Sequence, residues 1–291
     1  MPESVQTCPL CGRTDSRAFD RRIFRGREVH NRICPGCGLV FQSPRMSRQE
    51  ADDFYEGEYR RLYQGGEEPV AKDIAVQRAR ASTLVDFMRP YIRQLSSHLD
   101  IGCSTGIFMQ FVSRVYADTA VGIEPGKAYR DHASREGLKV YKSLGALKEH
   151  HTSLFNLVSM LHVLEHMADP VAYLVDLRKD ILAPAGWLLV EVPNLYAHDS
   201  FEIAHLVSFS AHTLGQTLYK AGYEIVLLEK HGRPRSKMIP YYLTVLARPL
   251  ARPGDVNIRP EKMVSLKRRL GLVHRRLMAR LFHGKVWQTI E

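Results

Sequence analysis

The chain has 291 residues, of which 45% are hydrophobic and 25% are charged, and its formal net charge is +10. These values match an ordinary globular protein with one large domain, or one domain and an appendage. The sequence contains no apolar run of 18 residues and no signal peptide. Both absences argue against a transmembrane or secreted chain, so we expect a cytoplasmic protein.

Four of the five cysteines form two Cys-x-x-Cys pairs near the start of the chain. The pairs are Cys8 with Cys11 and Cys34 with Cys37, and 22 residues separate them. Two such pairs offer four thiolates to one tetrahedral ion and leave no open position for catalysis, so we predict a structural zinc ion. Two disulfides are a weaker alternative because a cytoplasmic chain keeps them reduced, and a redox motif more often has a single pair.

The zinc-binding module is expected to span residues 1–45. Its residues 19–33 alternate in a way that predicts a hairpin turning at Gly26. The segment 46–70 that follows is expected to be a polar connector between the module and the next domain. Its aromatic residues are Phe54, Tyr55, Tyr59 and Tyr63.

Residues 71–250 have the pattern of an α/β domain. A helix is expected over 71–95, stopped or kinked near Pro90, and apolar runs then alternate with helix-compatible segments. Such alternation predicts a parallel sheet covered on both faces, with ligands outside the carboxyl ends of its strands. We predict strands near 97–101, 119–123, 138–142, 155–161, 186–192, 223–229 and 241–248. The polar residues at such ends, which should share one site, are Asp100, Glu124, His162 and Asn194.

The most informative segment is Ser-His-Leu-Asp-Ile-Gly-Cys-Ser-Thr-Gly-Ile-Phe, residues 97–108. A strand that stops at glycines and opens a helix lets a ligand approach bare backbone at the helix N-terminus. Glu124 ends the next strand 22 residues beyond Gly102, which suits a carboxylate that holds the hydroxyls of a ribose. A dinucleotide fingerprint would need glycine where Ser104 and Ile107 stand. The segment therefore predicts a nucleoside-containing cofactor and fits a dinucleotide poorly.

Three motifs carry a family resemblance: Leu-Asp-Ile-Gly-Cys-Ser-Thr-Gly at 99–106, the stretch 155–170 with His-Val-Leu-Glu-His, and the loop and strand at 182–194. In this order they resemble class I S-adenosylmethionine (SAM) dependent methyltransferases, over roughly residues 70–250. The resemblance implies an α/β fold with a Rossmann-like seven-stranded methyltransferase sheet. The chain would add a small N-terminal zinc ribbon and a C-terminal basic helix.

The resemblance also implies SAM as cofactor. The glycine turn would line its methionine and ribose portion, and Glu124 would hold the ribose hydroxyls. An acid usually found after the third strand is missing, which leaves Ser143 and Leu144 as adenine neighbours. The connector often lies over the cofactor in related enzymes, so Tyr55 and Tyr59 are candidate contacts. The cofactor-binding set is Asp100, Gly102, Ser104, Gly106, Glu124, His162 and Tyr59.

The general base is predicted among the histidines. His166 and His205 are the catalytic candidates, because a neutral imidazole suits proton abstraction and both follow strand ends. His162 is a weaker base candidate that better fits a contact on the cofactor side. A zinc hydrolase is rejected because its motifs place the acid differently between the histidines. A purely structural bond from His166 to the backbone of its turn is the alternative.

The tail from 251 to 291 carries ten basic and three acidic residues, which contributes +7 to the net charge. Apolar residues recur in it at steps of three and four, so an amphipathic basic helix is predicted. Three possibilities stand: packing on the parent domain with a solvated charged face, contact with an anionic membrane surface, or contact with an acidic ligand such as nucleic acid or a phosphorylated carrier.

The acceptor is expected to be a small molecule, such as a sugar, a polysaccharide or a natural-product intermediate. The cysteine pairs followed by Cys-Gly-Leu-Val-Phe-Gln-Ser-Pro-Arg resemble the front half of bacterial sugar C-methyltransferases and related enzymes. Whether O, N or C is methylated stays open. The alternatives are a zinc-knuckle rRNA base methyltransferase and a non-catalytic SAM-binding scaffold. The location of the basic excess, mainly in the tail, argues against the rRNA enzyme.

Overall fold

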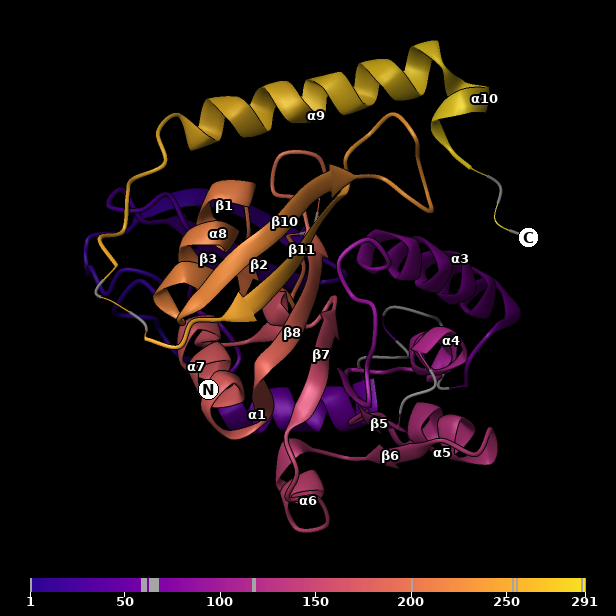
Figure 1. The fold of residues 1–291 in the computed structure, drawn as a ribbon. Helices are drawn as coiled ribbons and strands as arrows, with labels where there is room; N and C mark the ends of the chain where they lie inside the picture. Colours follow the sequence, from indigo (N-terminus) through magenta and orange to yellow (C-terminus); the bar gives the residue numbers. More distant parts are fainter. Residues whose placement is uncertain are drawn as a thin grey trace.

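A computed structural model describes residues 2–58, 62, 68–116, 119–199, 201–252, 254, 256–288 and 290. Its centre is a seven-stranded sheet with the order β10-β11-β8-β7-β4-β5-β6 (Figure 1). The strands are β4 (Ser97–Ile101), β5 (Thr119–Ile123), β6 (Lys139–Tyr141), β7 (Phe155–Leu161), β8 (Leu182–Pro193), β10 (Tyr223–His231) and β11 (Tyr242–Pro249). This confirms the predicted Rossmann-like methyltransferase sheet and the positions of its strands.

The sheet is mixed, so the expectation of a parallel sheet is wrong at one edge. Strands β6, β5, β4, β7 and β8 pair in parallel, whereas β11 runs antiparallel to both β8 and β10. The physical reason is the connection after β10. Residues 232–241 contain no helix, so the chain lacks the crossover that a parallel neighbour requires and returns as a hairpin.

Helices cover both faces of this sheet. Helices α3 (Ala71–Met88) and α4 (Ile107–Tyr116) pack on one face through a cluster that includes Leu84, Phe108 and Trp187. Helices α7 (Pro170–Asp180) and α8 (Ala211–Lys220) pack on the other. Helix α3 ends before Pro90, as the sequence predicts. The remaining domain helices are α5 (Lys127–Arg135) and the short α6 (Leu144–Lys148).

A second sheet of four strands holds the cysteine module, in the order β1-β2-β3-β9. Strands β1 (Arg17–Phe24) and β2 (Arg27–Ile33) form the predicted hairpin, which turns at Arg25 and Gly26 with φ of 48° and 82°. Two positive φ angles are what a tight hairpin turn requires. Strand β3 (Val40–Gln42) pairs with β9 (Val207–Ser208), which lies between β8 and β10 of the seven-stranded sheet in the chain. The module is therefore joined to the domain by backbone hydrogen bonds.

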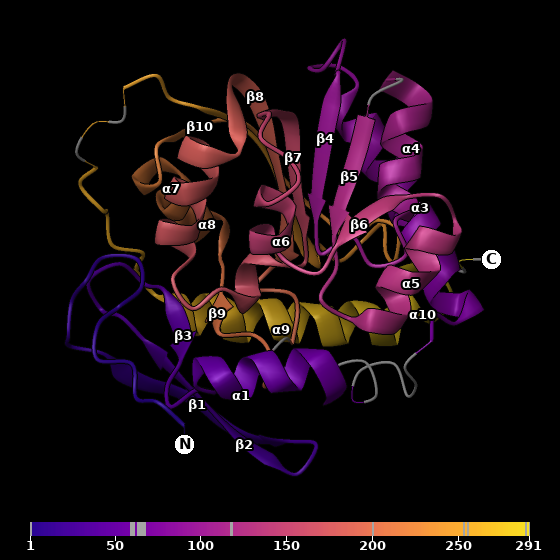
Figure 2. The ribbon, with the colours of Figure 1, turned by 90° about the horizontal axis from the view of Figure 1, so that it is seen from below.

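The remaining helices lie at the carboxyl ends of the parallel strands (Figure 2). Helix α1 (Arg48–Asp53) continues into a short π-helical turn (Phe54–Glu58), and α9 (Val264–Leu281) and α10 (His283–Val286) form the tail. The amphipathic basic helix expected in the tail is thus present. Among the described residues, no helix combines the length and the apolar character that crossing a membrane requires.

Candidate active site

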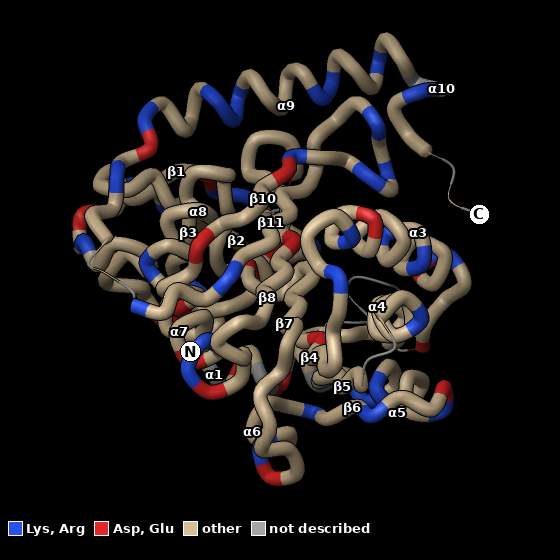
Figure 3. The backbone as a smooth tube through the Cα atoms, in the orientation of Figure 1, with Lys and Arg blue, Asp and Glu red and all other residues tan. Residues whose placement is uncertain are grey.

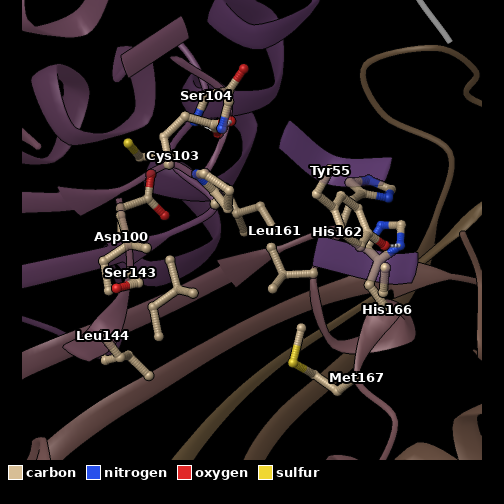
Figure 4. Close-up of a pocket in the computed structure, with 18 of the residues that line it drawn as sticks. Tyr55, Asp100, Cys103, Ser104, Ser143, Leu144, Leu161, His162, His166 and Met167 are labelled. Atoms are coloured by element: carbon tan, nitrogen blue, oxygen red, sulfur yellow. Dashed lines mark hydrogen bonds between the residues drawn. The ribbon is translucent and has the colours of Figure 1, made fainter. Parts of the chain in front are cut away.

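A cavity of about 810 Å³ opens at the carboxyl ends of β4, β5 and β7. This volume lies in the range that a drug-sized ligand or a cofactor occupies. Asp100, Ser104 and Ser143 lie toward one end of it, and Tyr55, His162 and His166 lie toward the other (Figure 4). The cavity therefore has two halves that differ in their side chains. We call the half with Asp100, Ser104 and Ser143 the glycine-turn half, and the half with Tyr55, His162 and His166 the histidine half.

The glycine turn after β4 forms the floor of the first half. Gly102 and Ser104, both on the cavity wall, have φ of 74° and 54°, a conformation that opens the tight turn into α4. Gly106 is not among the residues that line the cavity. A Cβ atom there would lie 2.1 Å from the Leu138 side chain, so this glycine permits close packing behind the turn.

Glu124 follows β5 and faces the turn from the side. Its carboxylate accepts backbone hydrogen bonds from Ser104 at 3.0 Å and from Gly126 at 2.9 Å, one on each oxygen. The side chain is buried yet lines the cavity, and a carboxylate can accept about four hydrogen bonds in all. Its orientation toward the cavity is thus fixed by the protein before any ligand is bound.

Asp100 lies at the end of β4 in a buried polar chain. Its carboxylate accepts a 2.6 Å hydrogen bond from Ser159, whose hydroxyl lies 2.8 Å from the Nε2 atom of His98. Burial raises the pKa of Asp100 to about 7, with a further contribution from the nearby Glu124. A cationic ligand in this half would favour the ionised form.

Ser143 and Leu144, the predicted adenine neighbours, both line the same half of the cavity (Figure 4). They follow β6, at the start of α6, and lie on the same side of the close-up as Asp100 (Figure 4). Tyr59, by contrast, lies outside the described residues, so its predicted contact with the cofactor stays a prediction.

His166 and Tyr55 form the centre of the histidine half. The Nδ1 atom of His166 lies 2.8 Å from the carbonyl oxygen of Ala204 and 3.0 Å from the Tyr55 hydroxyl. Because a carbonyl only accepts, Nδ1 carries the proton and Nε2 carries the lone pair. Burial lowers the pKa of His166 to about 4, so the ring is neutral near pH 7.

His205 lies beside His166, with ring centroids 5.0 Å apart, but it is not among the residues that line the cavity. Of the two catalytic candidates, His166 is therefore the one on the cavity wall.

His162 is on the wall in a different setting. Its Nε2 atom lies 3.1 Å from Glu191 and its Nδ1 atom 3.5 Å from Glu165. Burial and Arg80 act to lower the pKa of His162, but the two carboxylates outweigh them and raise it. A ring held between two buried carboxylates favours the cationic form and is poorly suited to act as a base.

Sequence reasoning missed charged residues of the site, of which two are arginines. Arg80 of α3 and Arg235 of the β10–β11 connection line the cavity, and Arg80 forms a 2.9 Å ion pair with the buried Glu191. This ion pair joins segments more than 100 residues apart, so no local pattern signals it. Asn194, expected at the site, instead bonds the Pro240 carbonyl and the Tyr196 amide and is not among the lining residues.

Two clusters have side chains of the kind that bind metal ions. The first is Cys8, Cys11, Cys34 and Cys37, whose sulfur atoms all lie within 4.8 Å of one another. The Sγ–Sγ distances of 3.5 Å for Cys8–Cys37 and 3.4 Å for Cys11–Cys34 exceed a disulfide bond and are close to the ~3.8 Å edge of a ZnS₄ tetrahedron. Burial and the neighbouring Cys8 raise the pKa of Cys34 to about 12, an effect that a bound cation would reverse.

The second cluster is Glu165, His166 and His205, whose ligand-type atoms also lie within 4.8 Å of one another. Glu165 is buried, and one of its carboxylate oxygens lies 3.5 Å from the Nδ1 atom of His162. His205 comes from a distant segment, so the sequence motif His-Val-Leu-Glu-His does not define this set.

The mixed seven-stranded sheet, with its cavity at the carboxyl ends of the strands, defines a Rossmann-like methyltransferase fold. A family model described as a methyltransferase domain matches residues 74–228, which is more than half of the chain. The chain therefore belongs to the methyltransferase domain family.

Curated relatives include two ubiquinone biosynthesis O-methyltransferases. That of Dinoroseobacter shibae is 35% identical over 106 residues, which cover 33% of this chain and 40% of the relative. That of Cereibacter sphaeroides is 30% identical over 148 residues, which cover 47% of this chain and 57% of the relative. The chain thus spans about half the length of these relatives.

Among solved structures, a Burkholderia thailandensis 1,6-didemethyltoxoflavin-N1-methyltransferase with bound 1,6-didemethyltoxoflavin and S-adenosylhomocysteine matches with a TM-score of 0.55 and 17% identity, covering 79% of this chain and 98% of that one. The [4+2]-cyclase SpnF matches with a TM-score of 0.54 and 15% identity, covering 75% and 100%. Identities this low show a shared fold and do not assign a reaction.

Proposed function

We propose that this protein transfers the methyl group of SAM to a small-molecule acceptor. One observation carries the proposal: a single cavity joins a nucleoside-type site at the glycine turn to a neutral histidine on the same wall. Membership of the methyltransferase domain family supports it. When bound, SAM supplies an electrophilic methyl group, and the chain must align an acceptor and hold its proton.

The residues of the glycine-turn half fit SAM. Glu124 presents to the cavity a carboxylate that two backbone amides already hold in place, and its oxygens would accept the two ribose hydroxyls. Asp100 offers a carboxylate to the cationic methionine portion. Gly102 and Ser104 bring backbone to the wall, while Ser143 and Leu144 would lie beside the adenine. Gly106 would contribute indirectly, by permitting the close packing of the turn.

On the acceptor side, we assign the general base to His166. Its Nδ1–H donates to the Ala204 carbonyl, which fixes the ring and puts the basic lone pair on Nε2. His205, whose ring packs beside that of His166, would help to hold that ring in position. It would serve as the base itself if the acceptor binds beyond His166. Tyr55 would then orient the acceptor through its hydroxyl.

This assignment predicts separate effects on binding and on turnover. His166→Ala should lower turnover about 10²–10⁴-fold and leave SAM affinity nearly unchanged. The loss should be smaller at high pH if the acceptor ionises unaided. His132→Ala, on α5 and away from the cavity wall, is the matched control. Near-native turnover in His166→Ala, His205→Ala and the double variant would show that histidine base catalysis is wrong.

The proposed acceptor class is a sugar, polysaccharide or natural-product intermediate. The names of the curated relatives refer to O-methylation in ubiquinone biosynthesis, and the Burkholderia enzyme binds 1,6-didemethyltoxoflavin, a small molecule. Both relatives support a small acceptor, and the O-methyltransferases favour a hydroxyl group in particular. An RNA base as acceptor is the less supported alternative.

We also assign one structural zinc ion to the four cysteines. The sulfur atoms all lie within 4.8 Å of one another, close enough to bind one ion, and all four positions would be filled by protein, which leaves none for catalysis. The ion would stabilise a module whose own sheet is completed by β9 of the domain.

A labelled-methyl transfer assay tests the function. The purified protein is incubated with methyl-labelled SAM and fractionated cell extracts, and products are identified by mass spectrometry. We expect label in a small-molecule fraction, and we expect loss of that label in His166→Ala. Label found in RNA would contradict a small-molecule acceptor and identify the protein as an RNA methyltransferase. Binding of SAM without label transfer to any fraction would favour a non-catalytic SAM-binding role.

A further inference from the structure

Helix α9 is attached to the domain through one buried arginine and a close backbone contact. The guanidinium group of Arg268 is buried, bonds the carbonyl oxygens of Leu195 and His198, and pairs with Asp199 at 3.1 Å. Gly271 lies so close to the loop after β8 that a Cβ atom there would be 1.9 Å from the Tyr196 carbonyl oxygen. The side of α9 that faces the protein is therefore built around an arginine and a glycine.

The opposite side of α9 is apolar and faces solvent. Five side chains recur at steps of four, three, four and four residues, which places them on one stripe of a helix with 3.6 residues per turn. Each is between 44% and 61% exposed, in contrast to the buried Val264 and Arg268. The stripe consists of Leu266, Leu270, Val273, Leu277 and Leu281. This arrangement rules out packing of the apolar stripe on the parent domain, one of the three possibilities that the sequence left open.

Cations accompany the stripe. Residues 264–288 contain seven Lys or Arg residues and no Asp or Glu (Figure 3). At 100° per residue, Arg269, Arg276 and Arg280 follow one edge of the stripe, and all three are exposed. Lys267, also exposed, lies beyond the other edge. The outer surface of α9 thus combines an apolar strip with flanking positive charge.

We propose that α9 binds anionic membrane surfaces, lying in the plane of the membrane with its apolar stripe in the headgroup–acyl boundary. A helix with one apolar face, flanking Lys and Arg, and insufficient apolar character to span a bilayer has the properties of an interfacial helix. Figure 1 shows α9 as the outermost layer of the molecule, with its length unobstructed.

Charge and chemistry favour this occupant over two others. A second copy of the chain would bring a second helix of the same sign, with no acidic residue in 264–288 to neutralise it. A nucleic acid would engage the cations but leave the five apolar side chains in water. An anionic bilayer can bury the apolar stripe and also bind the flanking cations through its headgroups.

The proposed membrane contact adjoins the cavity. Gln288, seven residues beyond the end of α9, donates a 2.9 Å backbone hydrogen bond to the carbonyl oxygen of Arg235. Arg235 is one of the residues that line the cavity. The docked protein would therefore hold one wall of the cavity close to the lipid surface. Membrane binding does not depend on the proposed methyl transfer, so it is tested without a turnover assay.

Vesicle flotation of the full chain tests the proposal. We expect the protein to float with vesicles of phosphatidylcholine and about 30% phosphatidylglycerol, and to remain unbound with phosphatidylcholine alone. Arg269→Gln with Arg276→Gln should weaken binding about 30-fold, at ~1 kcal/mol for each cation removed near the surface. Leu270→Gln with Leu277→Gln should weaken it by more than about tenfold, because apolar burial is lost.

Matched control variants distinguish an effect specific to the surface of α9 from the effect of removing any exposed apolar or cationic side chain. Ile23→Gln removes a more exposed apolar side chain in β1, and Arg93→Gln removes an exposed cation before β4; neither should change flotation. Retained SAM binding in each variant shows that the domain is folded. Absence of flotation at low salt would overturn the proposal. So would retained flotation in the leucine variant, or a concentration-dependent dimer that the leucine variant dissociates without any lipid binding.

Discussion

Removal of the Glu124 carboxylate gives the sharpest test of how the cavity holds a nucleoside. Glu124→Ala removes both carboxylate oxygens of this residue from the cavity wall. We therefore expect SAM and S-adenosylhomocysteine to bind more weakly. Two charge-assisted hydrogen bonds to the ribose correspond to about 1.5–3 kcal/mol, or roughly 10–150-fold in Kd. Titration calorimetry measures the change directly, with the exposed Glu149→Ala as the control.

The same carboxylate also accepts the Ser104 and Gly126 amides, so part of the loss could come from a distorted turn. A double-mutant cycle with the 2′-deoxy analogue of S-adenosylhomocysteine isolates the contact with the ribose. If Glu124 holds the 2′-hydroxyl, Glu124→Ala should cost the analogue markedly less than it costs the parent ligand. Equal losses for the two ligands would refute the ribose assignment, even if affinity falls.

Three further predictions concern the zinc module, Asp100 and helix α9. Elemental analysis should find about one zinc ion per chain in the purified protein. Cys8→Ser should release this ion and lower the melting temperature. Freshly purified, reduced protein that contains no metal would contradict the assignment. Burial raises the pKa of Asp100 to about 7, and the ionised form should favour the cationic SAM. SAM affinity should therefore rise from about pH 6 to about pH 8 in the native protein relative to Asp100→Asn, and parallel pH profiles would contradict this. Gly271→Val should detach α9 by collision with the Tyr196 carbonyl, seen as faster proteolysis within 264–288 at unchanged SAM affinity, and unchanged proteolysis would contradict the packing.

The sequence predicts the central fold well because its signals are local. The buried strands of the sheet are short apolar runs, and the turn after β4 is marked by its own glycines. The two-residue turn at Gly26 is local for the same reason. Strand β9 has two residues and no pattern, so its pairing with β3 could not be foreseen.

The site could be predicted only in part. Asp100 lies at the end of β4 and Glu124 directly follows β5, positions that the sequence pattern indicates, whereas Arg80 reaches the site through an ion pair with a residue 111 positions away. The placement of His166 on the cavity wall and of His205 behind it depends on packing between distant segments. An amphipathic pattern likewise does not reveal which face of α9 is attached, because burial of Arg268 depends on carbonyl groups in the loop after β8.

The most direct test of the account is a crystal structure of the protein with S-adenosylhomocysteine. We predict that the ligand fills the glycine-turn half of the cavity, with its ribose hydroxyls within hydrogen-bond distance of the Glu124 carboxylate. Its sulfur atom should face the half that contains Tyr55 and His166. A ligand bound elsewhere, or a ribose turned away from Glu124, would contradict the proposed arrangement of cofactor and acceptor.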